Sequence, residues 1–235
     1  MHIALRVRRF RQSHRECGPA ALKQSMEFLR PGKIYDIKEL ISETKSELKY
    51  LDWNYKLGIA ALKRGFGVTV YSASTDLYDP TWKGLSMKQL VKKLERRLYF
   101  IKHAKKKDIM AGYVWWWYRS SLEAAIEFLK AGGIVKIESI TKELLIGLLK
   151  RGTPPITPVN GSLVYGMKRA YFRRYNDVKG EYFGHIFMVS GYDGKKFVIT
   201  DPEKLSDRTK GIIKIDENLL LNSILTHTAE ILSVS

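Results

Sequence analysis

Residues 16–29 read ECGPAALKQSMEFL, and this stretch decides how the chain begins to fold. Its apolar residues recur three and four positions apart, which predicts an amphipathic helix from Cys17 to Leu29. Pro19 fixes the start, because proline fits the first helical turn but costs about 3 kcal/mol in a helix interior. Ser13 and Glu16 mimic a capping box, but a helix beginning there would carry the proline inside it. We therefore expect the cysteine at the N-terminal tip of the helix.

A cysteine at that position is suited to nucleophilic catalysis. A catalytic thiol needs to ionise readily, and it needs a base for its proton and donors for the oxyanion formed at the attacked carbonyl. The unpaired N–H groups of a helix N-terminus favour a thiolate and can bind an oxyanion. Cys17 is the only cysteine, so neither a disulfide within the chain nor a cysteine-based zinc cluster can form. The alternative interpretation is an inert, small hydrophobic residue.

A second stretch, residues 184–202 (GHIFMVSGYDGKKFVITDP), predicts a β-hairpin with strands over 185–192 and 197–200. The hairpin would bring His185 beside Asp201. Because side chains alternate along a strand, a two-residue turn at Asp193-Gly194 would put the two on opposite faces. A contact between them requires a three-residue loop over Asp193–Lys195 or a β-bulge. Without that contact, the histidine and the aspartate merely close a hairpin.

These motifs together resemble a known family. The segments ECGPAAL (16–22), LLKRGTPPI (148–156) and GH to DP (184–202), with Gln12 upstream, are similar to papain-like cysteine peptidases of the bacteriocin-leader (double-glycine) processing superfamily. The resemblance implies an α+β fold, in which an N-terminal helix carrying the cysteine packs on an antiparallel sheet carrying the histidine and the aspartate. It covers most of the chain outside residues 75–130.

The resemblance also implies roles for individual residues. Cys17 would be the nucleophile, His185 the general base and acid, Asp201 the carboxylate that orients the imidazole, and Gln12 the side-chain donor to the oxyanion. Gln12 departs from the pattern, because it lies five residues before the cysteine where the family usually has six.

Other polar residues near the cysteine extend this prediction. Ser13 and His14 are the alternative oxyanion donors, and Gly18 and Gly184 are expected to bind substrate by close backbone approach. His14 and Cys17 have the spacing of a metal-binding pair, but no second pair completes a tetrahedral site. We therefore set zinc aside and expect no cofactor.

The remaining pattern predicts one domain over residues 1–235, with 75–130 as a helical, aromatic-rich insertion or lid. The insertion contains a very basic helix over 87–106, the tryptophan run 115–117 as core or subunit interface, and a helix over 122–130. Outside it, further helices are expected over 37–50, 55–64, 142–150 and 218–225, and further strands over 68–71, 134–137, 155–159, 211–215 and 230–234. Helices followed by a strand-rich half indicate an α+β protein.

The chain has 41 Lys and Arg against 24 Asp and Glu, a formal net charge of +17. Such a field attracts phosphates or acidic surfaces, but the cations are spread along the chain outside any recognisable nucleic-acid motif. We favour a solvated basic face, with an acidic substrate consistent with the charge and nucleic acid as the less favoured partner. No apolar stretch reaches the ~20 residues that cross a bilayer, and no secretory signal is visible at the start, so we expect a cytoplasmic protein without a membrane partner.

Three functions follow from these observations. The first is a cysteine peptidase or amide hydrolase that works through an acyl-enzyme on Cys17. The second is an acyltransferase or transpeptidase that passes the same acyl group to an amine. The third is an inactive, basic binding module for nucleic acid or an acidic partner. The sequence leaves the substrate and the oligomeric state open.

Overall fold

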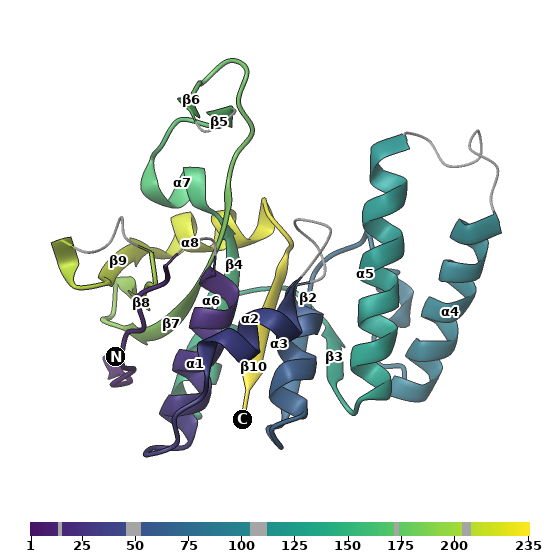
Figure 1. Cartoon of the computed structure of the whole chain (residues 1–235), viewed down its shortest axis with the longest axis horizontal. Helices are drawn as coiled ribbons and strands as arrows, with labels where there is room; N and C mark the ends of the chain where they lie inside the picture. Colours follow the sequence, from purple (N-terminus) through teal and green to yellow (C-terminus); the bar gives the residue numbers. More distant parts are fainter. Residues whose placement is uncertain (14–15, 46–52, 104–111, 172–173, 204–207) are drawn as a thin grey trace.

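An eight-stranded sheet lies at the centre of the fold, with helices on both of its faces (Figure 1). The computed structural model describes residues 1–13, 16–45, 53–103, 112–171, 174–203 and 208–235. The strand order is β3-β2-β10-β4-β7-β8-β9, and β1 pairs with β7. Strands β2 and β3 run parallel, and the other neighbouring strands of this sheet pair antiparallel. The strands are β1 (Ile3–Ala4), β2 (Val68–Ser72), β3 (Ile134–Ile137), β4 (Ile156–Asn160), β7 (Gly184–Tyr192), β8 (Lys196–Thr200), β9 (Ile212–Asp216) and β10 (Glu230–Val234).

The helices divide between the two faces of the sheet. Helices α1, α2, α3, α4 and α5 share one hydrophobic cluster with the sheet, and α6 and α8 contribute to the other. The bounds are α1 (Cys17–Leu29), α2 (Ile37–Thr44), α3 (Trp53–Leu62), α4 (Met87–His103), α5 (Gly112–Lys130), α6 (Lys142–Lys150), α7 (Gly161–Tyr165) and α8 (Glu217–Leu225), with a 3-10 turn η1 (Pro80–Trp82). A separate two-stranded hairpin, β5 (Ala170–Tyr171) and β6 (Arg174–Tyr175), follows α7.

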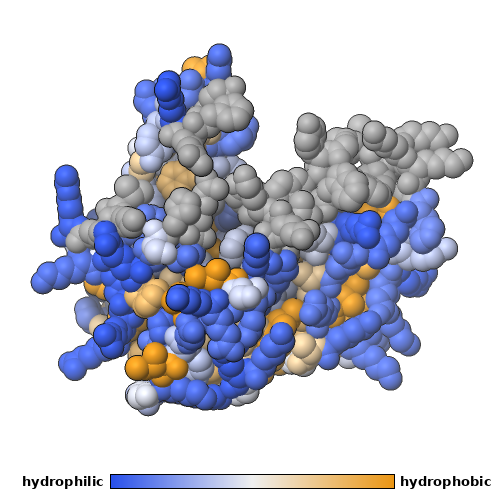
Figure 2. Space-filling model, viewed as in Figure 1, coloured by the Kyte–Doolittle hydropathy of each residue, from blue (hydrophilic) through white to orange (hydrophobic). Residues whose placement is uncertain are grey.

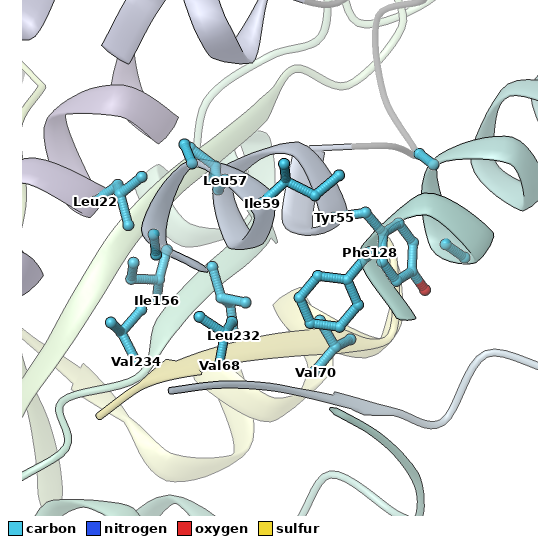
Figure 3. Packing of buried hydrophobic residues seen from close by; sticks show 14 of the residues in the cluster. Leu22, Tyr55, Leu57, Ile59, Val68, Val70, Phe128, Ile156, Leu232 and Val234 are labelled. Atoms are coloured by element: carbon cyan, nitrogen blue, oxygen red, sulfur yellow. The ribbon is translucent and has the colours of Figure 1, made fainter. Parts of the chain in front are cut away.

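The central strand β7 is buried on both faces because its side chains alternate between the two cores. Ile186 and Met188 join the cluster beneath α1 and α3, whereas Phe187 and Val189 join the cluster beneath α6 and α8. Figure 3 shows the first cluster from close by. Side chains of α3 lie there above those of β2 and β10, and Phe128 packs beside them. The fold class predicted from the sequence, a cysteine-bearing helix packed on a largely antiparallel sheet, is confirmed.

A β-bulge in the hairpin of β7 and β8 places His185 and Asp201 on the same face of the sheet. Tyr192 pairs with Phe197, but beyond a register shift between Val189 and Gly191, Met188 pairs with Thr200. Residues 193–196 lie between the paired Tyr192 and Phe197, so the predicted three-residue loop is not present; the alternative, a β-bulge, is, and its one-residue shift moves the end of β8 to the other face of the pairing. His185 and Asp201 therefore project from the same face of the sheet.

Helix α1 begins at Cys17, so the position predicted from Pro19 is correct. The N-cap residue is Glu16, and its side chain makes no capping bond to the helix; its carboxylate instead accepts hydrogen bonds from Ser13. Contact between α1 and β7 brings the helix tip to the start of that strand, where His185 lies.

The segment predicted as an insertion contains two helices that pack on each other. Helix α5 contacts α3 and β3 at the edge of the sheet, and α4 packs on α5. The predicted helix over 122–130 begins earlier, at Gly112, so the tryptophan run 115–117 is helical; its side chains lie outside the described part of the structure. Helix α2 ends at Thr44 and Lys45 is not helical, so the predicted helix over 37–50 is too long; residues 46–50, and the end of the predicted helix 87–106 beyond His103, lie outside the described residues. That 75–130 is a lid on a single domain stays a prediction.

In the described residues, no helix is both long and apolar enough to cross a membrane.

Candidate active site

The structure brings the cysteine, the histidine and the aspartate together from three elements. Cys17 is a free, half-buried thiol at the tip of α1. His185, on the second residue of β7, is 3% exposed, and Asp201, directly after β8, is fully buried. The Nε2 atom of His185 lies 2.8 Å from Oδ1 of Asp201. The charge of the Cys17 thiol also acts on His185, and because Nε2 is engaged with the aspartate, Nδ1 is the nitrogen left to face the sulfur.

The two partners hold His185 in its charged form. Burial alone opposes the positive charge, but the hydrogen bond to Asp201, together with the charges of Asp201 and Cys17, raises the pKa of His185 to about 10. The pKa of Asp201 shifts in the opposite direction. Burial opposes its negative charge, but the hydrogen bond and the charge of His185 outweigh burial and lower the pKa of Asp201. The site therefore favours an ionised pair of imidazolium and carboxylate near pH 7.

Tyr165 completes the surroundings of the carboxylate, and no motif in the sequence pointed to it. Its hydroxyl donates to Oδ2 of Asp201 over 2.6 Å, and its ring lies 5.8 Å from the ring of His185. Burial, and then the negative charge of Asp201, raise the pKa of Tyr165, which keeps its hydroxyl protonated as a donor. Asn160, whose side chain accepts from the Leu163 amide, caps the short helix α7 that carries the tyrosine.

The backbone around Asp201 is also held in place. The Glu203 amide donates to Oδ1 of Asp201 over 2.9 Å. Arg9 reaches across from the N-terminal segment, and its guanidinium donates to the carbonyl oxygens of Asp201 and Glu203, over 2.7 Å in each case. These bonds tie the segment before α1 to the segment after β8.

Gln12 lies beside the site, but its donor is already engaged. Its backbone amide donates to the Pro202 carbonyl over 3.0 Å, and its side-chain Nε2 donates to the carboxylate of Glu203. The side chain is 5% exposed, and its Oε1 atom has no hydrogen-bond partner. Gln12 is thus positioned near the triad with its amide group directed to an acid. Of the alternative donors, Ser13 bonds to Glu16, and His14 lies outside the described residues.

The two glycines predicted to bind substrate occupy different surroundings. Gly18 is buried, and a Cβ added there would lie 3.1 Å from the Trp53 ring and 3.3 Å from the Ile186 side chain. Its missing side chain therefore makes room for protein atoms. Gly184 is half-buried and begins β7, where it pairs with Asn160. A substrate role for either glycine stays a prediction.

Trp53, the tryptophan beside Gly18, is the first residue of α3, and the buried Glu230 holds this end of the helix in place. Glu230 at the start of β10 is 2% exposed, and it accepts hydrogen bonds from the Tyr55 hydroxyl over 2.6 Å and from the Asn54 amide over 3.2 Å. Burial raises the pKa of Glu230 against the effect of these donors. The first turn of α3, and with it Trp53, is therefore fixed against the tip of α1.

A second histidine lies near His185. His227, in the turn between α8 and β10, stacks edge-on with Tyr182 at 5.7 Å, and its Nδ1 lies 3.3 Å from the tyrosine hydroxyl. Burial, and then the positive charge of His185, lower the pKa of His227 to about 4. His227 is therefore neutral near pH 7 and can accept or donate a hydrogen bond there.

Among the described residues, no group of three or more His, Cys, Asp or Glu is arranged to hold a metal ion. The site's own side chains offer a thiol, an imidazole and a carboxylate.

No family model and no curated protein matches the sequence. The fold is similar to two solved structures. One is assigned as a C39-like peptidase from Bacillus anthracis, with a TM-score of 0.47 and 14% identity, covering 100% of this chain and 98% of the other. The second is the peptidase domain of Streptococcus ComA, a bifunctional ABC transporter of a quorum-sensing pathway, with a TM-score of 0.42 and 13% identity, covering 97% and 96%. At these identities the similarity concerns the fold alone.

Proposed function

We propose that the protein is a cysteine peptidase or amide hydrolase that acts through an acyl-enzyme on Cys17. The observation that supports this most directly is that His185 has Nε2 on Asp201 at 2.8 Å and interacts electrostatically with the Cys17 thiol. An imidazole held between a thiol and a carboxylate is the arrangement that nucleophilic cysteine chemistry requires.

Each residue has one task in the proposed reaction. The His185 imidazolium holds the proton that the thiol has given up, and the thiolate sulfur attacks the carbonyl carbon of the substrate, which converts the carbonyl oxygen to an oxyanion. The intermediate collapses when the C–N bond breaks and the imidazolium gives its proton to the leaving amine. A water molecule, deprotonated by His185, then hydrolyses the thioester and restores the thiol. Asp201 keeps the imidazole oriented and stabilises its charge throughout.

The backbone at the tip of α1 supplies donors for the oxyanion. The N–H groups of the first helical turn have no acceptor within the helix, and the positive end of the helix dipole lies there. Cys17 is the first residue of α1, so the carbonyl it attacks lies next to those groups. In this proposal Gln12 adds a side-chain donor once its amide leaves Glu203.

The first test is the rate at which iodoacetamide alkylates the protein, followed by mass spectrometry. Because Cys17 is the only cysteine, any label reports on that thiol alone. We expect native protein to react faster than urea-denatured protein near pH 6.5, and the matched variant His185→Ala, which retains the thiol, to lose that advantage. Cys17→Ser is the blank. Equal rates for native and denatured protein would contradict the proposal.

The second test detects the acyl-enzyme itself. The protein is incubated with a mixture of synthetic peptides and quenched with acid, and a mass increase on intact protein is sought. An adduct that Cys17→Ser does not form supports the proposal, and free carboxyl products identify hydrolysis. Products that carry an added amine would identify the acyltransferase or transpeptidase alternative. If no peptide, ester or amide substrate gives an adduct while the iodoacetamide test is also negative, the enzyme hypothesis is wrong.

A further inference from the structure

Helix α4 carries a straight stripe of cations and rings on its exposed side. Lys88, Lys92, Arg96, Tyr99 and His103 follow one another at spacings of four, four, three and four residues, and all five are exposed. Residues three and four positions apart lie above one another on a helix surface. The five side chains therefore line one face along the full length of the helix.

The opposite face of α4 packs into the hydrophobic core. Leu90, Leu94 and Ile101 are buried, and the helix packs on α5. Figure 2 shows hydrophilic residues over the edge of the molecule where α4 and α5 lie, and in Figure 1 this edge is separated from the tip of α1 by α3. The stripe is thus held facing solvent, away from the candidate active site.

The one acidic residue of α4, beside the stripe, pairs with a cation of another helix. Helix α4 contains six Lys and Arg and one acidic residue, Glu95, whose carboxylate pairs with Lys130 at 2.7 Å. In the described part of the chain, Lys88, Lys92 and Arg96 form no ion pair. Three cations therefore remain available to an anionic partner.

The stripe also offers an exposed aromatic surface beside its cations. The Tyr99 side chain is 67% exposed, and its ring stacks on His103 with centroids 4.1 Å apart and planes inclined by 30°. Lys92, Glu95, Arg96 and Tyr99 line an open hollow of about 580 Å³. A flat ring next to two cations in a hollow is suited to a flat, anionic ligand unit.

We propose that this face of α4 binds single-stranded nucleic acid. Four residues of helix rise by about 6 Å, so Lys88, Lys92 and Arg96 form a row whose spacing is comparable to that of consecutive phosphates on one strand. Tyr99 then provides a ring on which a base stacks, in the combination of basic track and aromatic platform that sequence-tolerant single-strand binding uses. An anionic membrane fits less well, because the apolar face that would enter a bilayer is buried against α5.

The test measures binding of fluorescently labelled 12-nucleotide RNA and DNA strands of mixed sequence by anisotropy at several salt concentrations. We expect binding at low salt that weakens as salt rises. The triple variant Lys88→Gln, Lys92→Gln, Arg96→Gln should reduce the slope of log affinity against log salt by about 2, because each phosphate contact contributes about 0.7. Tyr99→Ala should weaken binding by about 5- to 150-fold without changing that slope.

A matched control removes the same charge elsewhere. Lys38, Lys150 and Lys195 are exposed and lie on other elements, so their triple replacement by Gln should leave the salt slope within about 0.5 of wild type. Equal losses for both triple variants would overturn the proposal in favour of an unspecific effect of net charge. Absence of binding at low salt, or binding to phosphatidylserine vesicles that outcompetes both strands, would also overturn it. Cys17→Ser should bind like wild type, which separates this proposal from the peptidase one.

Discussion

Tyr165 and Asp201 share a hydrogen bond of 2.6 Å, in which the phenol hydroxyl donates to Oδ2 of the carboxylate. The other oxygen, Oδ1, lies 2.8 Å from His185 Nε2 and also accepts from the Glu203 amide. Donors therefore hold both oxygens of the fully buried carboxylate, which fixes the plane of the group and directs Oδ1 to the imidazole. We infer that Tyr165 positions the aspartate, without itself touching substrate.

Tyr165→Phe should lower stability and shift the acid side of the activity profile. The variant keeps the ring, which stacks on Phe183, but removes a hydrogen bond to a buried charge, a loss of about 2 kcal/mol. Because that bond lowers the pKa of Asp201, its removal raises that pKa, and activity should begin to fall at a higher pH on acidification. Urea unfolding and pH-dependent alkylation of Cys17 measure both effects. Tyr175→Phe, at an exposed ring, is the control, and an unshifted profile would leave Tyr165 with a purely structural role.

Asp201→Asn should separate charge from geometry at the histidine. The Asn side chain can still accept from Nε2, but it lacks the negative charge that helps to raise the pKa of His185. The imidazolium should therefore lose its proton at a lower pH than in wild type. We expect the variant to be alkylated at Cys17 about tenfold or more slowly than wild type at pH 7. At alkaline pH the rates of variant and wild type should converge. Identical rates at pH 7 would show that the carboxylate charge does not support the histidine.

Stability should also depend on pH in a window set by these two groups. The pKa of His185 is raised in the folded state, so its contribution is complete below pH 6.5 and is lost as the pH rises towards about 10. The pKa of Asp201 is lowered, so its contribution is present above its ordinary value of 3.8 and is lost as the pH falls further. Melting temperatures should therefore decline on both sides of a plateau. In His185→Phe, the part of the alkaline decline that comes from this group should disappear.

The triad could be predicted from the sequence because each part has a local signal. Pro19 fixes the start of α1, and the alternation of side chains shows that a bulge or a three-residue loop is needed for His185 and Asp201 to meet. The bulge at Ser190 has only an unspecific signal in the sequence, because Gly191 within the strand is compatible with a bulge but also with a close approach of another backbone segment. Local patterns thus indicated that His185 and Asp201 contact each other, but not that a β-bulge brings them together.

Tyr165 and Glu203 could not be predicted, because their partners are distant in the sequence. Helix α7 has five residues, too few to show a helical period; the available signals were Asn160 before it and Gly166 after it, which has a φ of 61°. The hydrogen bond of Gln12 to Glu203 joins segments 191 residues apart and depends on how the N-terminal segment crosses the end of β8. Spacing to Cys17 alone could not reveal it.

Gly18→Ala tests the contact between α1 and Trp53. The added methyl group would lie 3.1 Å from the ring and 3.3 Å from Ile186, so the tip of α1 must shift by a few tenths of an ångström. Overpacking costs about 1–3 kcal/mol, and the higher helix propensity of alanine returns up to about 1. We expect a net loss of about 1 kcal/mol in urea unfolding and slower alkylation of Cys17. Gly147→Ala in α6, whose methyl would meet only the flexible end of Arg151 at 3.5 Å, is the control and should not destabilise the protein.

Gln12 and Glu203 provide the sharpest test of how the oxyanion is stabilised. The Gln12 amide donates to the Glu203 carboxylate, so the same amide reaches a substrate oxyanion only after it exchanges partners. If it does so during the reaction, Gln12→Ala should lower kcat by about 100-fold with little change in KM, which is the cost of losing one oxyanion donor.

The variant Glu203→Gln distinguishes a role of Gln12 as oxyanion donor from a purely structural role. The neutral side chain binds the Gln12 amide less tightly than a carboxylate does, so kcat should stay equal or rise while stability falls by about 1 kcal/mol. The double variant should show the loss of Gln12→Ala alone, because the role of Glu203 passes through the glutamine. If Gln12→Ala keeps full kcat while its stability drops, the glutamine serves only to join the N-terminal segment to Glu203, and the backbone N–H groups at the tip of α1 must stabilise the oxyanion unaided.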